Sequence, residues 1–330
     1  MAGLVISILI GFTSAFILAL IIYWLDRYEK EPKILLGAAF IWGAVVSSGG
    51  AFLINTVLGV GIYLFTGSEA ATNITTGSII APIIEESLKG FAVLLVFVVF
   101  RKEFDSILDG IIYAAVTALG FAATENSYYI YTYGFMENGW SGVGLLTFVR
   151  VILVGWQHPF YTAFIGIGLA IARTNRNAAL KILFPLIGWG AAVLAHSTHN
   201  TLASFASGIE GLILGAFFDW TGWFFMAIFI FWMITRERKL LVNYLKDEVA
   251  AGLLTTAQYR TACSAWAQTR ARSSAFFRGH LRPTSRFYQL CGELAHKKYQ
   301  LMTLGDEGGN QKTIDLIRSE MANLSTSALF

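Results

Sequence analysis

Charged residues are scarce in this sequence: Asp, Glu, Lys and Arg together make up 14% of its 330 residues, whereas soluble domains carry about 25%. Hydrophobic residues make up 55%, and the mean hydropathy is +0.60. This composition argues against an ordinary soluble enzyme and predicts a protein whose main solvent is a lipid bilayer.

Cysteine is equally rare. Cys263 and Cys291 are the two cysteines of the chain, so the sequence offers neither a disulfide framework nor a zinc knuckle. We expect ordinary thiols in a reducing compartment. The N-terminus also lacks a basic segment and a small-residue cleavage site, which predicts that the first apolar run is kept as a spanning helix.

Long apolar runs dominate the first 234 residues. A helix needs about 20 apolar residues to cross a membrane, and by this measure the sequence predicts an all-α, polytopic bundle of about seven transmembrane helices. The expected spans are residues 4–25, 34–58, 78–100, 107–131, 147–172, 180–203 and 212–234.

Lys and Arg residues are confined to alternate connections between these spans. The connections at residues 66–77, 132–146 and 204–211 contain neither residue type. Because Lys and Arg are retained on the cytoplasmic side, we expect a multi-pass protein of the cytoplasmic (inner) membrane. Its N-terminus would lie outside and its C-terminus in the cytoplasm.

The last part of the chain, residues 235–330, has a different character. It carries 14 Lys and Arg against 8 Asp and Glu, a balance of +6, whereas residues 1–234 carry 10 against 13, a balance of −3. We expect a small, helical cytoplasmic tail after a transmembrane domain of residues 1–234. The positive charge suits attraction to an anionic inner leaflet, and it equally suits a solvated basic surface. The bilayer is an expected partner, and nucleic acid is not.

Ionisable side chains inside the predicted spans need an explanation, because each costs about 2.5–3.5 kcal/mol on insertion scales. They cluster in four consecutive spans. The third span contains Glu85, Glu86 and Lys89, the fourth Glu125 and Asn126, the fifth His158, and the sixth His196, His199 and Asn200.

Depth in the membrane links these residues. At 1.5 Å per helical residue, Glu85 and Glu125 lie ~10 Å and ~9 Å below the outer edge. His158 lies ~16 Å below it, and His196 falls in the same outer half. Four helices that run in alternating directions thus place polar groups at a shared depth, so we predict that the groups face one another.

Helical spacing adds a second constraint, because residues four apart share a face. Glu85 and Lys89 are so placed, and an ion pair would reduce the cost of burying both. His196 and Asn200 are also four apart, and His199 could join them or bond to a neighbouring helix. Neighbouring positions point ~100° apart, so the sequence does not decide between Glu85 and Glu86 as a catalytic base.

Converging carboxylates and imidazoles suggest a divalent metal, and zinc is the expected ion. Metal-bound water is activated near neutral pH, a further carboxylate can act as base, and Asn can stabilise an oxyanion. A metal-free mechanism, in which Glu and His activate the water, stays open. For three other residues we expect structural roles: Asp109 at a helix start, Asp219 at the membrane interface, and Arg150 reaching toward the outer boundary.

At these residues the chain resembles the PrsW family of bacterial intramembrane proteases, a distant relative of the CAAX prenyl endopeptidases and bacteriocin-processing membrane proteases. The family motifs occur in order. EExxK is matched by Glu85, Glu86 and Lys89, FxxxEN by Phe121, Glu125 and Asn126, the next conserved histidine by His158, and HxxxN by His196 and Asn200.

The resemblance implies a peptidase that cuts a membrane-anchored protein, with Glu85 or Glu86 activating the water. It also implies that Glu125, His158 and His196 bind metal or polarise the scissile carbonyl, and that Asn200 assists the oxyanion. Some members of the family cleave anti-sigma factors on the outer side of the membrane. The alternative function is a proton- or solute-coupled carrier, which would also place ionisable groups inside the membrane.

Overall fold

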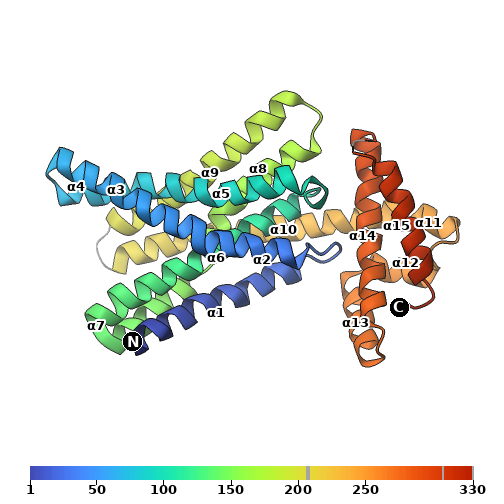
Figure 1. Ribbon diagram of the computed structural model, residues 1–330, viewed down its shortest axis with the longest axis horizontal. Helices are drawn as coiled ribbons and strands as arrows, with labels where there is room; N and C mark the ends of the chain where they lie inside the picture. The colour runs from blue at the N-terminus through green and yellow to red at the C-terminus, as the bar shows by residue number, and fades with distance from the viewer. Residues whose placement is uncertain (206–208, 307, 329–330) are drawn as a thin grey trace. The chain divides into compact units, whose positions relative to one another are not determined.

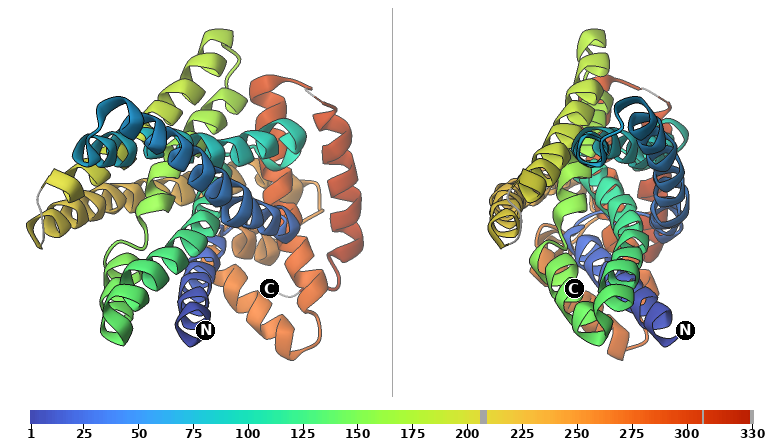
Figure 2. Two further views of the ribbon diagram at one scale, coloured as in Figure 1. Left: turned by 60° about the vertical axis from the view of Figure 1, so that its left-hand side comes forward. Right: turned by 90° about the vertical axis from the view of Figure 1, so that its left-hand side faces the viewer.

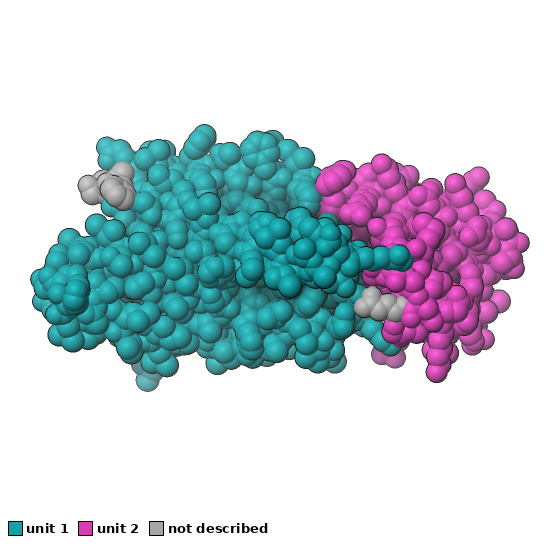
Figure 3. Space-filling view, turned by 90° about the horizontal axis from the view of Figure 1, so that it is seen from above, with its two compact units in different colours: residues 1–24, 31–229 teal, residues 25–30, 230–330 magenta. Residues whose placement is uncertain are grey.

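The structure is a computed structural model that describes residues 1–205, 209–306 and 308–328. Within these ranges the chain forms helices, loops and turns but no strand (Figure 1), so the predicted all-α fold is confirmed. The chain divides into two compact units (Figure 3). The membrane unit consists of Met1–Trp24 and Glu31–Phe229, and the tail unit consists of Leu25–Lys30 and Ile230–Phe330.

Among the described residues, five helical segments are long and apolar enough to cross a membrane: Ala2–Leu25, Lys33–Thr66, Ile107–Thr174, Ala178–Ser204 and Ile209–Ala250. The segment Ile107–Thr174 contains two of the predicted spans. The helix α5 (Ala81–Val99) is not among the five, and it carries Glu85, Glu86 and Lys89. The multi-pass character of the chain is therefore supported, whereas the count of seven spans and their orientation stay predictions.

The helix α6 (Ile107–Tyr129) forms the centre of the membrane unit, and 18 of its 23 residues are buried. Small residues allow its neighbours to approach it closely, as is common between membrane helices. A Cβ atom on Gly120 would lie 2.0 Å from the carbonyl oxygen of Phe40 in α2 (Lys33–Ile41), and one on Gly110 would lie 2.3 Å from that of Gly166 in α8 (Gln157–Thr174). The backbones of three helices therefore meet at these glycines.

The start of α6 is fixed by a capping box. The Ser106 hydroxyl accepts a hydrogen bond from the backbone N–H of Asp109, and the Asp109 carboxylate accepts one from the backbone N–H of Ser106. Such reciprocal bonds satisfy donors that a helix leaves free at its first turn. The expected helix-start role of Asp109 is confirmed.

The connection predicted at residues 132–146 is helical, which corrects the expectation of a loop. The chain continues from α6 through η4 (Ile130–Phe135) into α7 (Met136–Thr147) and reverses at Gly139, where φ is 61°. Helix α1 (Ala2–Leu25) runs beside this stretch of chain (Figure 1, Figure 2). The absence of Lys and Arg from these residues indicates only the side of the membrane, not their secondary structure.

The span predicted at residues 147–172 is broken, which is a second correction. A π-helical turn, η5 (Phe148–Leu153), ends at Val154, and α8 begins anew at Gln157. Pro159 lies in the first turn of α8, where its missing N–H is tolerated, whereas a helix interior would lose a hydrogen bond. The break therefore places His158 at the beginning of a helix.

The tail unit has its own apolar core, built around Leu241, Phe287, Leu294 and Met321. Its helices are the end of α10 (Ile209–Tyr244), α11 (Lys246–Ala250), α12 (Thr256–Ala262), α13 (Ala265–Phe277), α14 (Leu281–Leu304) and α15 (Asn310–Leu324).

Residues 25–30, between the first two predicted spans, belong to this tail unit. The Tyr28 side chain is buried in its core. The backbone N–H of Lys30 donates to Gln289 Oε1 (2.7 Å), and Gln289 Nε2 donates back to the Lys30 carbonyl (3.0 Å). Glu29 lies 2.7 Å from His296 Nδ1. The tail unit therefore forms around a segment more than 200 residues earlier in the sequence.

A buried carboxylate, Glu248, joins two helices of the tail unit. It accepts hydrogen bonds from Arg318 (2.7 and 3.0 Å) and Lys298 (3.0 Å). Burial alone would raise the pKa of Glu248, but the hydrogen bonds from Arg318 and Lys298 outweigh it and lower the pKa below the ordinary 4.5. The stabilisation is therefore present above pH 4.5 and is lost as the pH falls through the lowered pKa.

We expect Glu248→Gln to destabilise the tail unit by roughly 1.5–3 kcal/mol, because hydrogen bonds to a charged group are lost. Cys291 is fully buried, so the rate of thiol labelling under native conditions measures how often this unit opens. The rate should rise about tenfold or more at neutral pH. Glu320→Gln, which removes the exposed pair with Arg286, is the control; equal rates in the two variants would contradict the prediction.

Candidate active site

Glu86 and Lys89 form an ion pair in the interior of the membrane unit, and both are fully buried. Lys89 Nζ lies 2.6 Å from Glu86 Oε1. His196, from α9 (Ala178–Phe205), lies with Nδ1 2.9 Å from the same oxygen, and Thr162, from α8, donates to Oε2 at 2.8 Å. Both oxygens of Glu86 are therefore engaged, and the carboxylate ties α5, α8 and α9 together.

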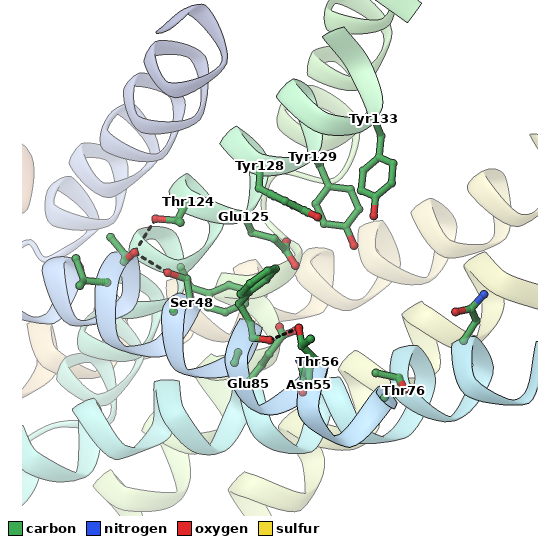
Figure 4. Close-up of a pocket in the computed structure, with 18 of the residues that line it drawn as sticks. Ser48, Asn55, Thr56, Thr76, Glu85, Thr124, Glu125, Tyr128, Tyr129 and Tyr133 are labelled. Atoms are coloured by element: carbon green, nitrogen blue, oxygen red, sulfur yellow. Dashed lines mark hydrogen bonds between the residues drawn. The ribbon is translucent and has the colours of Figure 1, made fainter. Parts of the chain in front are cut away.

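Glu85 has a different environment, although it is the neighbouring residue. Its Oε2 lies 3.8 Å from Lys89 Nζ and 3.9 Å from His196 Nε2. No described residue forms a hydrogen bond with this buried oxygen. Because adjacent helical positions point ~100° apart, Glu86 faces the centre of the bundle while Glu85 lines a groove (Figure 4).

His158 connects this cluster to α6. Its Nε2 lies 2.9 Å from Glu125 Oε2, its Nδ1 lies 3.4 Å from Lys89 Nζ, and its ring lies 5.3 Å from the ring of His196. The structure therefore brings the predicted histidines of the fifth and sixth spans together with the carboxylates of the third and fourth.

Arg150 pairs with Glu125, a partner that the sequence analysis did not identify. Its Nη2 donates to Glu125 Oε2, its Nε donates to Asn126 Oδ1 (2.8 Å), and the guanidinium lies 4.0 Å from the centre of the Tyr129 ring. A guanidinium offers several donors in one plane, so a single Arg binds both polar residues of the FxxxEN motif.

Asp219 is fully buried in the membrane unit, and its expected position at the membrane interface stays a prediction. Tyr161 donates to Asp219 Oδ1 (2.5 Å), and His199 Nδ1 lies 2.8 Å from Oδ2. The Tyr161 ring stacks on His196 with centroids 5.0 Å apart. Asp219 therefore orients a tyrosine that supports His196, and His199 takes part in this helix–helix contact.

Asn200 lies one helical turn after His196, but its amide is engaged elsewhere. Nδ2 donates to the carbonyl oxygen of Gly77 (2.8 Å) in η2 (Thr76–Ile80), a π-helical turn before α5. An oxyanion role for Asn200 would require this bond to be exchanged, and that role stays a prediction.

Three buried residues of the cluster could hold a metal ion. Glu85, His158 and His196 each offer a ligand atom, and these atoms lie within 4.8 Å of one another. Two imidazoles and one carboxylate are a donor set typical of catalytic zinc, and the unpaired oxygen of Glu85 is available as a ligand. The residues present fit a divalent ion, with Glu85 in the place that the sequence analysis gave to Glu125.

Comparison with known proteins assigns the sequence to a family. The model of the PrsW family intramembrane metalloproteases matches residues 31–234. The chain belongs to this family. It is 25% identical to Protease PrsW of Bacillus subtilis over 218 residues, which are 66% of this chain and 87% of that protein.

Two further PrsW relatives match over shorter segments. Protease PrsW of Clostridioides difficile is 34% identical over 36% of this chain, and the match spans half of that protein. Protease PrsW of Geobacillus kaustophilus is 33% identical over 34% of this chain and 46% of its own length. No solved structure matches the chain. The predicted family is confirmed, and the enzyme class that it implies is a membrane protease.

The PrsW motifs in the sequence identified the cluster but missed two of its members. Tyr161 and Thr162 follow His158 by three and four residues, so they share its helical face, and both are fully buried. Polar residues three or four positions after a histidine in a membrane helix can be predicted to join its site, and this spacing would have identified Tyr161 and Thr162. Asp219 offered no comparable signal, because its partners come from other helices.

We expect Asp219→Asn to weaken the packing of α8, α9 and α10, since the carboxylate has two polar partners in the interior. The loss should be roughly 1.5–3 kcal/mol, the range for hydrogen bonds to a charged group. Unfolding of the detergent-solubilised protein by denaturant measures it. Glu210→Gln, at an exposed position of the same helix, should change stability little; equal effects of the two changes would contradict the prediction.

Proposed function

We propose that this protein is an intramembrane endopeptidase in which Glu85 activates the attacking water. The observation that carries the proposal is the unpaired Glu85 oxygen beside the buried His158 and His196. Glu86 does not suit this role, because Lys89, His196 and Thr162 occupy both of its oxygens. Glu86 is instead a positioning residue that fixes Lys89 and His196.

Hydrolysis of a peptide bond requires a proton to move twice. Glu85 takes a proton from water as the water oxygen attacks the scissile carbonyl carbon, and later returns it to the leaving amide nitrogen. Lys89, 3.8 Å from Glu85, supplies positive charge beside the carboxylate. Both histidines are buried, so their rings are shielded from bulk solvent.

A divalent ion held by Glu85, His158 and His196 would act as a Lewis acid toward the water and the scissile carbonyl. A carboxylate has two oxygens, so Glu85 can face the imidazoles with one and accept a proton with the other. Glu125 would then support His158 through their 2.9 Å contact, as carboxylates commonly do for metal-binding histidines.

The proposed substrate is a membrane-anchored protein, cut in the outer half of the cytoplasmic membrane. Support comes from the calculated depth of Glu85 and Glu125 and from the membership of the family. A regulator of the anti-sigma-factor kind is the substrate class that the resemblance implies.

Glu85→Gln should lower the rate of cleavage by at least ~100-fold, the lower range for loss of a general base. Because the substrate is unidentified, the measurement is mass spectrometry of new protein N-termini in membranes of cells that express the wild type or the variant. Peptides that begin within or beside transmembrane segments should be present with the wild type and lost with Glu85→Gln.

Glu137→Gln is the matched control, because Glu137 is exposed in α7, and it should give the wild-type pattern. Both variants must accumulate in the membrane to the wild-type level. Identical N-termini with wild type and Glu85→Gln would contradict the proposal and favour the carrier function.

A further inference from the structure

A groove of about 910 Å3 leads to Glu85 and Glu125 within the membrane unit (Figure 4). One wall is α3 (Ser48–Thr66), the opposite wall is the end of α6 with η4, and η2 contributes a third side. Most of the lining is apolar or aromatic, and it includes Phe52, Val60, Phe121, Tyr128, Tyr129 and Tyr133. The groove is thus continuous with the candidate active site.

The wall formed by α3 is loosely attached to the rest of the unit. The structure describes every residue of α3, and of these Ala51 alone is buried. By contrast, most of α6 on the opposite wall is buried. Phe52 and Val60 are more than half exposed although they line the groove. An opening between a loosely and a tightly packed helix gives a partner in the bilayer lateral access to Glu85.

Three polar atoms in this groove have no hydrogen-bonding partner in the described part of the chain: Asn55 Oδ1, Thr76 Oγ1 and Glu85 Oε2, all of them buried. Two are pure acceptors, and the hydroxyl can accept as well. A buried acceptor without a partner costs about 1–3 kcal/mol. A ligand that pairs with Asn55 and Thr76 must supply hydrogen-bond donors, which the acyl chain of a lipid cannot do.

A polypeptide backbone supplies such donors only where it is not helical. In an α-helix the N–H groups are bonded within the helix, except in its first turn. A transmembrane helix that stayed intact would therefore offer no free backbone N–H to Asn55 or Thr76 beyond its first turn. An extended segment offers free N–H groups along its length, and it also exposes the peptide bond that must be cut.

We propose that this groove binds an extended segment of a membrane-anchored polypeptide, with Asn55 and Thr76 accepting hydrogen bonds from its backbone. This inference rests on the proposed function, because it makes the groove the path by which the substrate reaches Glu85. It names the conformation of the substrate: the segment beside the scissile bond is unwound. It also assigns Asn55 and Thr76 as binding residues outside the four sequence motifs.

Two synthetic fluorescent peptides test the inference with the full chain in lipid nanodiscs. Each has one apolar span of about 20 residues, and the outer segment is rich in Gly and Ser in one and in Ala in the other. The Gly- and Ser-rich segment favours an extended chain, and the Ala-rich segment favours a helix. Affinity is measured by fluorescence, and gels of the same samples show whether the peptide is cut.

The wild type should bind the Gly- and Ser-rich peptide at least about tenfold more tightly than the Ala-rich peptide. The double variant Asn55→Leu/Thr76→Val should lose about tenfold or more in affinity for it, as expected for two hydrogen bonds. Thr76→Ser keeps the hydroxyl and should restore binding at that position. Thr66→Val is the control, because the Thr66 hydroxyl donates to Ile62 in its own helix outside the groove.

Equal affinity for the two peptides, no binding by the wild type, or unchanged binding by a correctly folded double variant would overturn the inference. If the wild type binds neither peptide and the groove holds lipid, the ligand of the groove is an acyl chain. Tight binding of a peptide that the wild type leaves intact would support the groove and count against the protease. Cleavage that is unaffected by Asn55→Leu/Thr76→Val would support the protease and count against the groove as the binding site.

Discussion

The ion pair of Glu86 and Lys89 is the interaction on which the candidate site depends. Two charges without solvent are costly, and they persist only when every donor and acceptor is matched. Here the same carboxylate also bonds to His196 and Thr162, so one group orders residues of three helices. Glu85, on the adjacent face, has one oxygen without a hydrogen-bonding partner in the described part of the chain. Of two neighbouring carboxylates, one thus holds the structure and the other is available for chemistry.

A second layer of polar contacts supports the two histidines from outside this pair. Glu125, held by Arg150, contacts His158, and Asp219 holds Tyr161 against His196. Buried side chains with few alternative partners keep one orientation, which a metal site or a general base requires. The groove beside Glu85 has the opposite character, since one wall is loosely packed and three of its polar atoms lack a hydrogen-bonding partner among the described residues. A candidate active site with tightly held side chains thus lies beside a groove with one loosely packed wall.

The sequence predicted the fold class and the convergence of Glu85, Glu86, Glu125, His158 and His196, because membrane burial makes each charge informative and helical spacing fixes faces. It could not divide the roles of Glu85 and Glu86, since the hydrogen-bonding partners of Glu86, Thr162 and His196, come from helices that are distant in sequence. The partners of Arg150 and Asp219 were missed for the same reason, because they are set by the packing of helices that are distant in sequence. The break before His158 was also missed, although Pro159 marks it in retrospect.

The metal content of the purified protein tests the central assignment most directly. Plasma mass spectrometry would compare the wild type with Glu85→Gln and Glu125→Gln, each shown to be folded. Our account predicts about one zinc or similar divalent ion per chain in the wild type, since Glu85, His158 and His196 form a three-ligand set. The ion should be lost in Glu85→Gln and largely kept in Glu125→Gln. A metal-free wild type, or an ion lost only with Glu125→Gln, would contradict it.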